Sequence, residues 1–318
     1  MLRTFLLALA SALACGASAQ DYPSRPIRLI VPFAPGGGTD ILIRILAPKL
    51  GATLGQQLVV ENRPGASSII GTELVARSAP DGYTVLAVDT TFTVNPSLQP
   101  KLPYDSLKDL APVIHLAAAP VILVLHPSVP AQTVKELVAL AKSKPGALAY
   151  ASGGNGASTH LAGELFKMVA GVDIVHVPYK GTGPAIADVV AGQVQMNFAG
   201  ISSARPFVES GRLRAIAVTG ARRNPALPEA PTFAEAGLPG VDAGTHWGLL
   251  VPAGTPADVI GKLNVQTDRV LQQPDVKARI AELGFEAAGG TPEAWAALVR
   301  AEMTKWARVV KEARIKID

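Results

Sequence analysis

The feature that most constrains the fold is a repeated alternation of short apolar segments with segments whose apolar residues recur at helical spacing. This pattern predicts strands at residues 27–31, 58–60, 84–88, 113–116, 121–126, 148–152, 174–177, 195–199, 213–218 and 246–251. It predicts helices at residues 41–54, 69–76, 134–144, 159–169, 185–191 and 204–210, with two more that begin near Thr255 and Thr291. Such alternation is typical of α/β proteins, in which helices cover both faces of largely parallel sheets.

The number of predicted strands indicates two sheets rather than one. A single sheet holding all of them would be unusually broad for a chain of 318 residues. Proline and glycine mark two places, near Pro120 and Gly244, where the chain would cross between lobes. We therefore expect two mixed, mostly parallel sheets flanked by helices. Residues 121–243 would form one lobe and residues 20–120 with 244–318 the other, with a ligand cleft between them.

Composition excludes several classes of protein. The chain is 48% hydrophobic and 17% charged, which is unlike a disordered or fibrous protein. The net charge is +4, but the basic residues are scattered and aromatic residues make up only 5%. Because a nucleic-acid-binding surface needs clustered positive charge, we expect no nucleic-acid partner.

The N-terminus has the layout of a secretory signal peptide over residues 1–19. Arg3 precedes an apolar run at residues 5–14, and small residues at Ala17 and Ala19 form a cleavage site. We expect cleavage after about Ala19 and export to the periplasm. Cys15 is the single cysteine and would be removed with the leader, so no disulfide framework is expected. Acylation of Cys15 as a lipoprotein anchor is the alternative.

Two glycine-rich loops each follow a predicted strand and precede a predicted helix. The first contains Gly36, Gly37 and Gly38, and the second runs from Gly153 to His160. Backbone N–H groups at such positions favour an anion. Neither loop has the lysine of a phosphate-binding loop or the glycine spacing of a dinucleotide site. Each loop taken alone is also compatible with a simple turn, whereas the pair favours binding.

Catalytic and metal-binding patterns are incomplete. Ser158 and His160 lie in a sequence that resembles a nucleophile elbow, but the final glycine is missing and their spacing disfavours a proton relay. A secreted hydrolase that uses Ser158 or His160 is therefore an alternative hypothesis. The five histidines do not pair at metal-binding spacing, so we expect no metal and no cofactor. His160 is the histidine best placed to contact a ligand, with local packing as the other interpretation.

Two acidic residues stand next to the predicted anion site. Asp89 ends a strand and is either a cap for the next turn or a partner for an ammonium or hydroxyl group of the ligand. Asp40 follows the first glycine loop and lies in the first turn of its helix, where the helix dipole stabilises an acid. Both interpretations stay open for each residue.

A series of motifs resembles the extracytoplasmic solute receptors of tripartite tricarboxylate transporters, the Bug-type binding proteins. The matching stretches are YPSRPIR from Tyr22, VPFAPGGGTD from Val31, VENRPGA from Val60, PDGYT from Pro80, LPYD from Leu102, AYASG from Ala149, HLAGE from His160, HVPYKG from His176, RAIAVT from Arg214 and PAGTP from Pro252. Their order and spacing cover essentially the whole chain after the leader. The resemblance implies a two-lobed periplasmic binding protein of type II-like architecture, without enzymatic activity, that closes on a small carboxylate.

The resemblance also implies which residues line the site. The loop residues 33–39 would hold one ligand carboxylate, and loops of the other lobe would face it. The implied ligand-binding residues are Phe33, Ala34, Pro35, Gly36, Gly37, Gly38, Thr39, Asp89, Thr90, Ser152, Gly153, Asn155, Ser158, Thr159, His160, Tyr179, Lys180, Gly181, Ala199 and Gly200. The implied partners are a di- or tricarboxylate, aromatic acid or amino acid and the membrane permease subunits of the transporter, with the receptor itself monomeric. A ligand sensor for a membrane signalling partner is the other alternative.

Overall fold

The structure, a computed structural model, describes residues 22–99, 101–179 and 181–315. The predicted signal peptide, its cleavage point near Ala19, Cys15 and the predicted ligand residue Lys180 lie outside the described residues. Within those ranges, no helix combines the length and the apolar character needed to cross a lipid bilayer.

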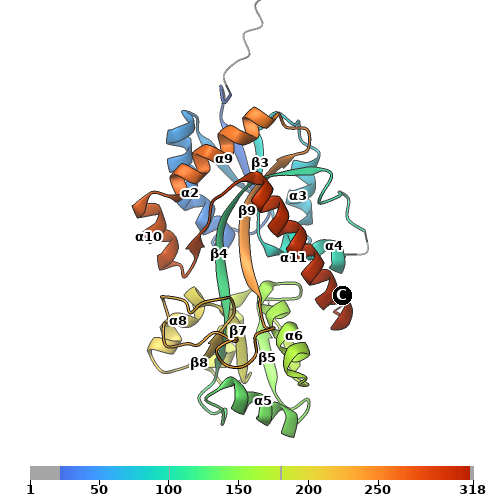
Figure 1. Ribbon diagram of the computed structural model, residues 1–318, viewed down its shortest axis with the longest axis vertical. Coiled ribbons are helices and arrows are strands. Elements are labelled where there is room, and N and C mark those ends of the chain that lie inside the picture. The colour runs from blue at the N-terminus through green and yellow to red at the C-terminus, as the bar shows by residue number, and fades with distance from the viewer. Residues whose placement is uncertain (1–21, 100, 180, 316–318) are drawn as a thin grey trace, which may run out of the picture.

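Helices alternate with strands along the chain, as the sequence pattern predicts (Figure 1). The strands are β1 (Ile27–Val31), β2 (Leu58–Asn62), β3 (Thr84–Val88), β4 (Leu110–Leu125), β5 (Ala149–Ser152), β6 (Val175–Pro178), β7 (Met196–Gly200), β8 (Arg214–Val218), β9 (Gly244–Pro252) and β10 (Glu286–Ala287). The helices are α2 (Gly38–Leu54), α3 (Ile69–Ala76), α4 (Thr90–Leu98), α5 (Val134–Ser143), α6 (Ser158–Ala170), α7 (Thr182–Val190), α8 (Ile201–Glu209), α9 (Ala257–Leu271), α10 (Pro274–Glu282) and α11 (Pro292–Glu312).

The molecule is elongated, with two α/β halves joined end to end (Figure 1). The upper half in that view holds β1, β2 and β3 with α2, α3, α9 and α10, and the lower half holds β5 to β8 with α5 to α8. The strand order is β2-β1-β3-β9-β4-β7-β5-β6, with β8 and β10 also paired to β4. Strands β1, β2 and β3 are mutually parallel, and so are β5, β6 and β7. The chain thus has the expected mixed α/β fold. The two separate sheets predicted from the sequence are instead one continuous ten-stranded sheet among the described residues, because β4 pairs with strands of both halves.

Strand β4 differs from the prediction. The apolar runs at 113–116 and 121–126 are parts of one strand, Leu110–Leu125, which continues through Pro120. Pro120 is the last residue of β4 to pair with β9, opposite Gly244, and Val121 is the first to pair with β7, opposite Gly200. Because β4 changes its partner here, the N–H that proline lacks removes little from either ladder. Strands β4 and β9, in the middle of the sheet, are antiparallel to their neighbours, so the sheet is parallel only toward its two ends.

Each half has a buried cluster on both faces of its strands. In the upper half, Leu46 of α2 and Leu263 of α9 lie in one cluster, and Val75 of α3 lies in the other. In the lower half, Phe166 of α6 lies in one cluster and Ile186 of α7 in the other. Burial of these apolar faces explains why the amphipathic segments form helices against the sheets.

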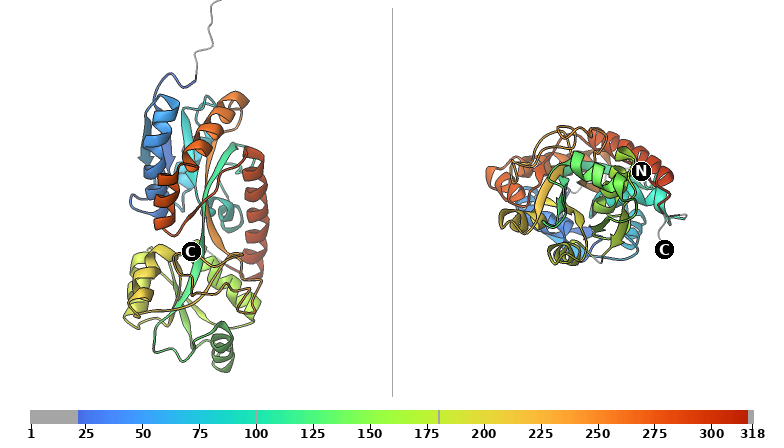
Figure 2. Two further views of the ribbon diagram at one scale, coloured as in Figure 1. Left: turned by 60° about the vertical axis from the view of Figure 1, so that its left-hand side comes forward. Right: turned by 90° about the horizontal axis from the view of Figure 1, so that it is seen from below.

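Helix α11 belongs to both halves. Its first turns contribute Trp295 and Val299 to a cluster of the upper half, while Trp306, Val309 and Val310 pack in the cluster of the lower half that contains Phe166. Figure 2 shows the helix running along one side of the molecule across the junction. The division drawn from the sequence placed this segment wholly with the first lobe, and its second half packs against residues of the other.

The carboxyl ends of the parallel strands of both halves point toward the junction. Val88 at the end of β3 pairs with Gly248 of β9, and Gly200 at the end of β7 pairs with Val121 of β4. Because ligands of open α/β sheets bind outside the carboxyl ends of the strands, the loops that follow β1, β3, β5, β6 and β7 are the natural place for a site.

Candidate ligand-binding site at the junction of the two halves

The first glycine loop joins β1 to α2 and leaves the start of the helix bare. Gly36 has a φ of 84°, which favours glycine, whereas Gly37 has a φ of −78° that any residue adopts. Gly37 is the N-cap of α2, and no side chain caps the helix. Gly37 and Gly38 are exposed and Thr39 is buried. The backbone N–H groups of this first turn, at the positive end of the helix dipole, are suited to an anion.

The side chain of Asp40 stabilises this loop through hydrogen bonds to the protein. Its carboxylate accepts hydrogen bonds from Gly36 N (2.9 Å), Arg44 Nε (2.9 Å) and Asn62 Nδ2 (2.9 Å), and Asn62 Nδ2 also donates to the carbonyl of Phe33 (3.1 Å). Burial acts to raise the pKa of Asp40, but the bonds from Arg44, Gly36 and Asn62 outweigh it and lower the pKa. Asp40 therefore shapes the loop and is engaged with protein groups rather than with a ligand.

Asp89 ends β3 and is the N-cap of α4. Its Oδ1 accepts a hydrogen bond from Thr91 N at 2.8 Å, which bears out the capping interpretation. Its Oδ2 lies 3.4 Å from the hydroxyl of Thr39, and Trp247 Nε1 donates to the same hydroxyl at 3.0 Å. Burial raises the pKa of the Asp89 carboxyl, and the hydrogen bonds from Thr91 and Thr39 oppose that rise. The neighbouring Thr90 is buried, and its hydroxyl donates to the Gly244 carbonyl at 3.2 Å.

The second glycine loop joins β5 to α6 and is held by its own side chains. Gly153 N donates to Thr159 Oγ1 (3.0 Å), and Gly156 N donates to His160 Nδ1 (3.1 Å). Ala157 is the N-cap of α6, and no side chain caps this helix either. Asn155, at the tip of the loop, is exposed.

A stack of two histidines, of which His160 is buried and His176 is half-buried, supports the second loop. The rings of His160 and His176 lie parallel with centroids 4.0 Å apart, and His176 Nε2 lies 2.6 Å from the Ser152 hydroxyl. Burial lowers the pKa of His160 to about 4; burial, and then the neighbouring His160, lower that of His176 to about 3. Both rings are therefore neutral near pH 7, and a neutral His160 has the Nδ1 lone pair that accepts from Gly156.

The remaining predicted residues start two more helices without side-chain caps. Gly181, with a φ of 109°, is the N-cap of α7, and Gly200 is the N-cap of α8. Ala199 is buried in β7. Tyr179 is half-buried, and its hydroxyl donates to Asp188 Oδ2 at 2.6 Å; burial and Asp188 raise its pKa to about 12. The N-caps of α2, α6, α7 and α8 are thus glycine or alanine, and these helices begin at the ends of β1, β5, β6 and β7.

Strand β9 brings the two glycine loops together. Trp247 reaches Thr39 at the first loop, and the hydroxyls of Thr245 and Ser158 of the second loop lie 2.8 Å apart. Thr245 and Trp247 are two residues apart on one strand, so their side chains point to the same face. The loops of the upper and lower halves therefore meet on a single face of β9. Phe285 stacks on Trp247 with ring centroids 4.4 Å apart.

The geometry gives no support to a serine hydrolase. Among the described residues, Ser158 is bonded to Thr245 and His160 to Gly156, rather than to each other. The pair formed by Ser152 and His176 is close enough for a proton relay, but Ser152 is fully buried and out of reach of a substrate. In the described part of the chain, no group of three or more His, Cys, Asp or Glu residues is arranged to hold a metal ion.

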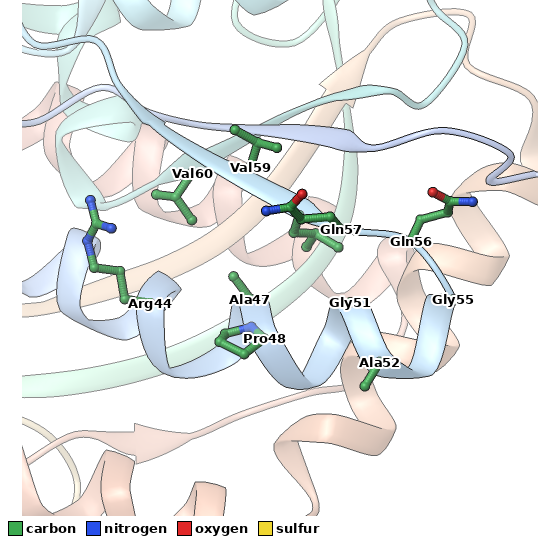
Figure 3. A pocket seen from close by; sticks show the side chains of 11 residues that line it. Arg44, Ala47, Pro48, Gly51, Ala52, Gly55, Gln56, Gln57, Val59 and Val60 are labelled. Atoms are coloured by element: carbon green, nitrogen blue, oxygen red, sulfur yellow. The ribbon is translucent and has the colours of Figure 1, made fainter.

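A surface hollow of about 780 Å³ lies on α2 and β2, away from the junction (Figure 3). Its lining includes Arg44, Pro48 and Gln57 and none of the ligand residues predicted from the sequence. The hollow shares only helix α2 with the first glycine loop.

The fold and the paired loops define a class of protein. Two α/β halves joined by crossing strands, with bare helix N-termini facing the junction, form a periplasmic binding protein, and solved structures with high similarity bear this out. The profile of the tripartite tricarboxylate transporter family receptors matches residues 42–315. The chain belongs to this family, as a Bug-type periplasmic solute-binding protein.

Three relatives illustrate the similarity. Protein BugT of Bordetella pertussis is 38% identical over 307 residues, which cover 96% of this chain and 94% of BugT. Rpa4515 of R. palustris, solved with adipate, is 36% identical with a TM-score of 0.83, covering 93% of this chain and 99% of that one. MatC of Rhodopseudomonas palustris, solved with bound malate, is 35% identical with a TM-score of 0.79, covering 91% and 100%.

Sequence reasoning found the loops but missed the groups that connect them. Thr245, His176 and Phe285 were not singled out, although each contacts a predicted residue or its neighbour. Trp247 lies three residues after Gly244, where the sequence predicts a crossing between lobes, and it contacts Thr39. The place of each in the site depends on a contact made through folding, for which a local pattern gives no signal.

Proposed function

We propose that this receptor captures a small carboxylate between two lobes, residues 20–120 with 244–318 and residues 121–243. It then delivers the carboxylate to the permease subunits of a tripartite tricarboxylate-type transporter. One ligand carboxylate binds the bare first turn of α2, and the loops at the starts of α6, α7 and α8 close over the rest. The observation that carries the proposal is the meeting of two uncapped helix N-termini on one face of β9. Two relatives were solved with adipate and malate, which are both small dicarboxylates.

In this proposal, the protein binds its ligand without catalysing a reaction. The Ser158 hydroxyl faces Thr245, and His160 uses Nδ1 to accept from the backbone, so neither residue is arranged to activate a nucleophile. A receptor that signals to a membrane partner would use the same closed form. Capture of permease subunits from solubilised membranes by the ligand-loaded protein distinguishes transport from signalling.

Calorimetry on ligand-free protein tests the proposal. The protein is unfolded in denaturant and refolded to remove any bound molecule, then titrated with a panel of mono-, di- and tricarboxylates and with their uncharged amides. We expect at least one carboxylate to bind and its amide to fail, because the N–H groups of α2 are arranged for an anion. Equal binding of acid and amide, or silence across the panel, contradicts the proposal.

A further inference from the structure

Asp89 and Thr39 form a directed chain of hydrogen bonds beside the first glycine loop. An indole N–H only donates, so Trp247 Nε1 gives its proton to the Thr39 hydroxyl (3.0 Å). The proton of Thr39 is then directed toward Asp89 Oδ2 (3.4 Å). Thr91 N donates to the other oxygen, Oδ1, at 2.8 Å. Both carboxylate oxygens of Asp89 therefore act as acceptors.

The carboxylate of Asp89 is incompletely satisfied. The 3.4 Å contact with Thr39 is longer than the roughly 2.7–2.8 Å usual for a hydroxyl donor. Among the described residues, the hydrogen bonds to this carboxylate come from Thr39 and Thr91 alone, and neither residue carries a charge. Among the described residues, Asp89 makes no salt bridge, although it is partly buried. A carboxylate without a cationic partner can accept a further hydrogen bond from a donor on a bound ligand.

The position of this acceptor defines where the donor must be on a ligand. Thr39 is the second residue of α2, so its backbone N–H belongs to the turn proposed to hold a carboxylate, while its side chain contacts Asp89. The carboxylate and the donor of a ligand would therefore be separated by about the span of one residue. A 2-hydroxy acid and a 2-amino acid have this arrangement, because the donor is on the carbon next to the carboxylate.

We propose that Asp89 is a specificity-determining residue that selects acids with a hydroxyl or ammonium group at carbon 2 over the same acids without it. This inference rests on the proposed function and narrows its ligand class. A plain acid brings its own negative charge close to Asp89 and has no donor at carbon 2. Closure of the lobes would then bury the Asp89 carboxylate without a hydrogen bond from the ligand. An ammonium group is expected to bind more tightly than a hydroxyl, because it donates to Asp89 and also neutralises the negative charge of Asp89.

Matched sets of ligands test the inference by calorimetry. Each set differs only at carbon 2: succinate, malate and aspartate; propionate, lactate and alanine; phenylpropionate, phenyllactate and phenylalanine. We expect the hydroxy or amino acid of the set that fits best to bind about tenfold or more tightly than the plain acid. Equal affinity within every set that binds overturns the role of Asp89 but leaves the proposed function intact. Silence of all three sets while another plain carboxylate of the panel binds overturns the inference alone, whereas silence across the whole panel overturns the proposed function as well.

Two variants separate the role of Asp89 in binding from its role as a cap. Asp89→Asn and Asp89→Ser both keep a good N-cap for α4, so both fold. The amide oxygen of Asp89→Asn still accepts from a hydroxyl, so we expect the preference for the amino acid to collapse and that for the hydroxy acid to weaken less. Asp89→Ser is too short to reach a ligand and removes both preferences. Asp258→Asn, an exposed first-turn acid of α9, is the charge-matched control and changes neither. Unchanged preferences in the Asp89 variants contradict the proposal.

Discussion

The three adjacent glycines of the first loop have different roles at the residue scale. Gly36 is needed for its conformation, because its φ of 84° is unfavourable for other residues. Gly37 has an ordinary φ of −78°, and a Cβ there would meet only the Ala34 carbonyl oxygen, at 3.7 Å. A side chain at Gly37 would therefore not strain the backbone. The absence of a side chain at Gly37 leaves the backbone N–H groups of the first turn of α2 accessible to a ligand.

The two positions give a pair of contrasting variants. Gly37→Val is expected to keep its stability and lose about tenfold or more in carboxylate affinity, because the branched side chain covers the N–H groups. Gly36→Ala is expected to lose about 1–2 kcal/mol of stability from its left-handed backbone. Urea unfolding and calorimetry measure both. Normal affinity of a folded Gly37→Val protein would show that the ligand does not approach this loop.

The histidine stack predicts a loss of stability in acid. The folded protein lowers the pKa of His160 from 6.5 to about 4 and that of His176 to about 3, so the unfolded chain binds more protons below pH 6.5. Stability contributed by the neutral rings is full above about pH 6.5 and declines as the pH falls toward about 4. Urea unfolding between pH 7 and pH 4 measures the slope. A His160→Asn variant with an unchanged slope would contradict this assignment.

At the scale of elements, α11 ties the two halves together. Its 21 residues extend for roughly 30 Å at 1.5 Å per residue, enough to reach from one buried cluster to the other. Trp306 is fully buried in the lower cluster, and its Nε1 donates to Glu302 Oε2 at 2.8 Å within the helix. The helix therefore adds a third link beside β4 and β9.

Removal of the Trp306 side chain tests this link. Trp306→Ala is expected to lower the free energy of unfolding by about 3–5 kcal/mol, because it leaves a large cavity between α11 and the lower half. Arg308→Ala, on the exposed face of the same helix, is the matched control and is expected to change stability by less than about 0.5 kcal/mol. Chemical denaturation measures both. A small loss for Trp306→Ala would show that the end of α11 is dispensable for packing.

The sequence predicted local elements better than their partners. Periodicity located α2 and α6, and the Thr291 cap marks the start of α11, where it accepts from Ala294 N at 3.2 Å. The same reasoning split β4 at Pro120, because a proline normally ends a strand and the change of partner at that residue is a long-range event. In the candidate site, the glycine loops were visible as motifs. The bonds from Thr245 and Trp247 were not, because they join residues 87 and 208 positions apart.

For the whole molecule, the proposed closure of the two lobes predicts a change of shape. Both halves present their loops to the junction, where β4, β9 and α11 connect them. A saturating carboxylate is expected to lower the radius of gyration in small-angle scattering. It is also expected to stabilise the protein by about 2.7 kcal/mol at a hundredfold excess over Kd. At the same ligand concentration, the Gly37→Val protein is expected to gain about 1.4 kcal/mol or less, because its affinity is about tenfold or more lower. Tight binding with an unchanged radius would contradict closure.

The bond between Trp247 and Thr39 gives the molecule a built-in optical probe. The chain has three tryptophans, and Trp295 and Trp306 are buried along α11. Trp247 alone bonds to the first glycine loop, so its indole experiences the field of any charge that arrives there. Intrinsic fluorescence is therefore expected to report ligand binding at the first glycine loop without a label. The Trp247→Phe variant is the control that lacks this signal. The receptor can thus be screened in its native form against hundreds of compounds.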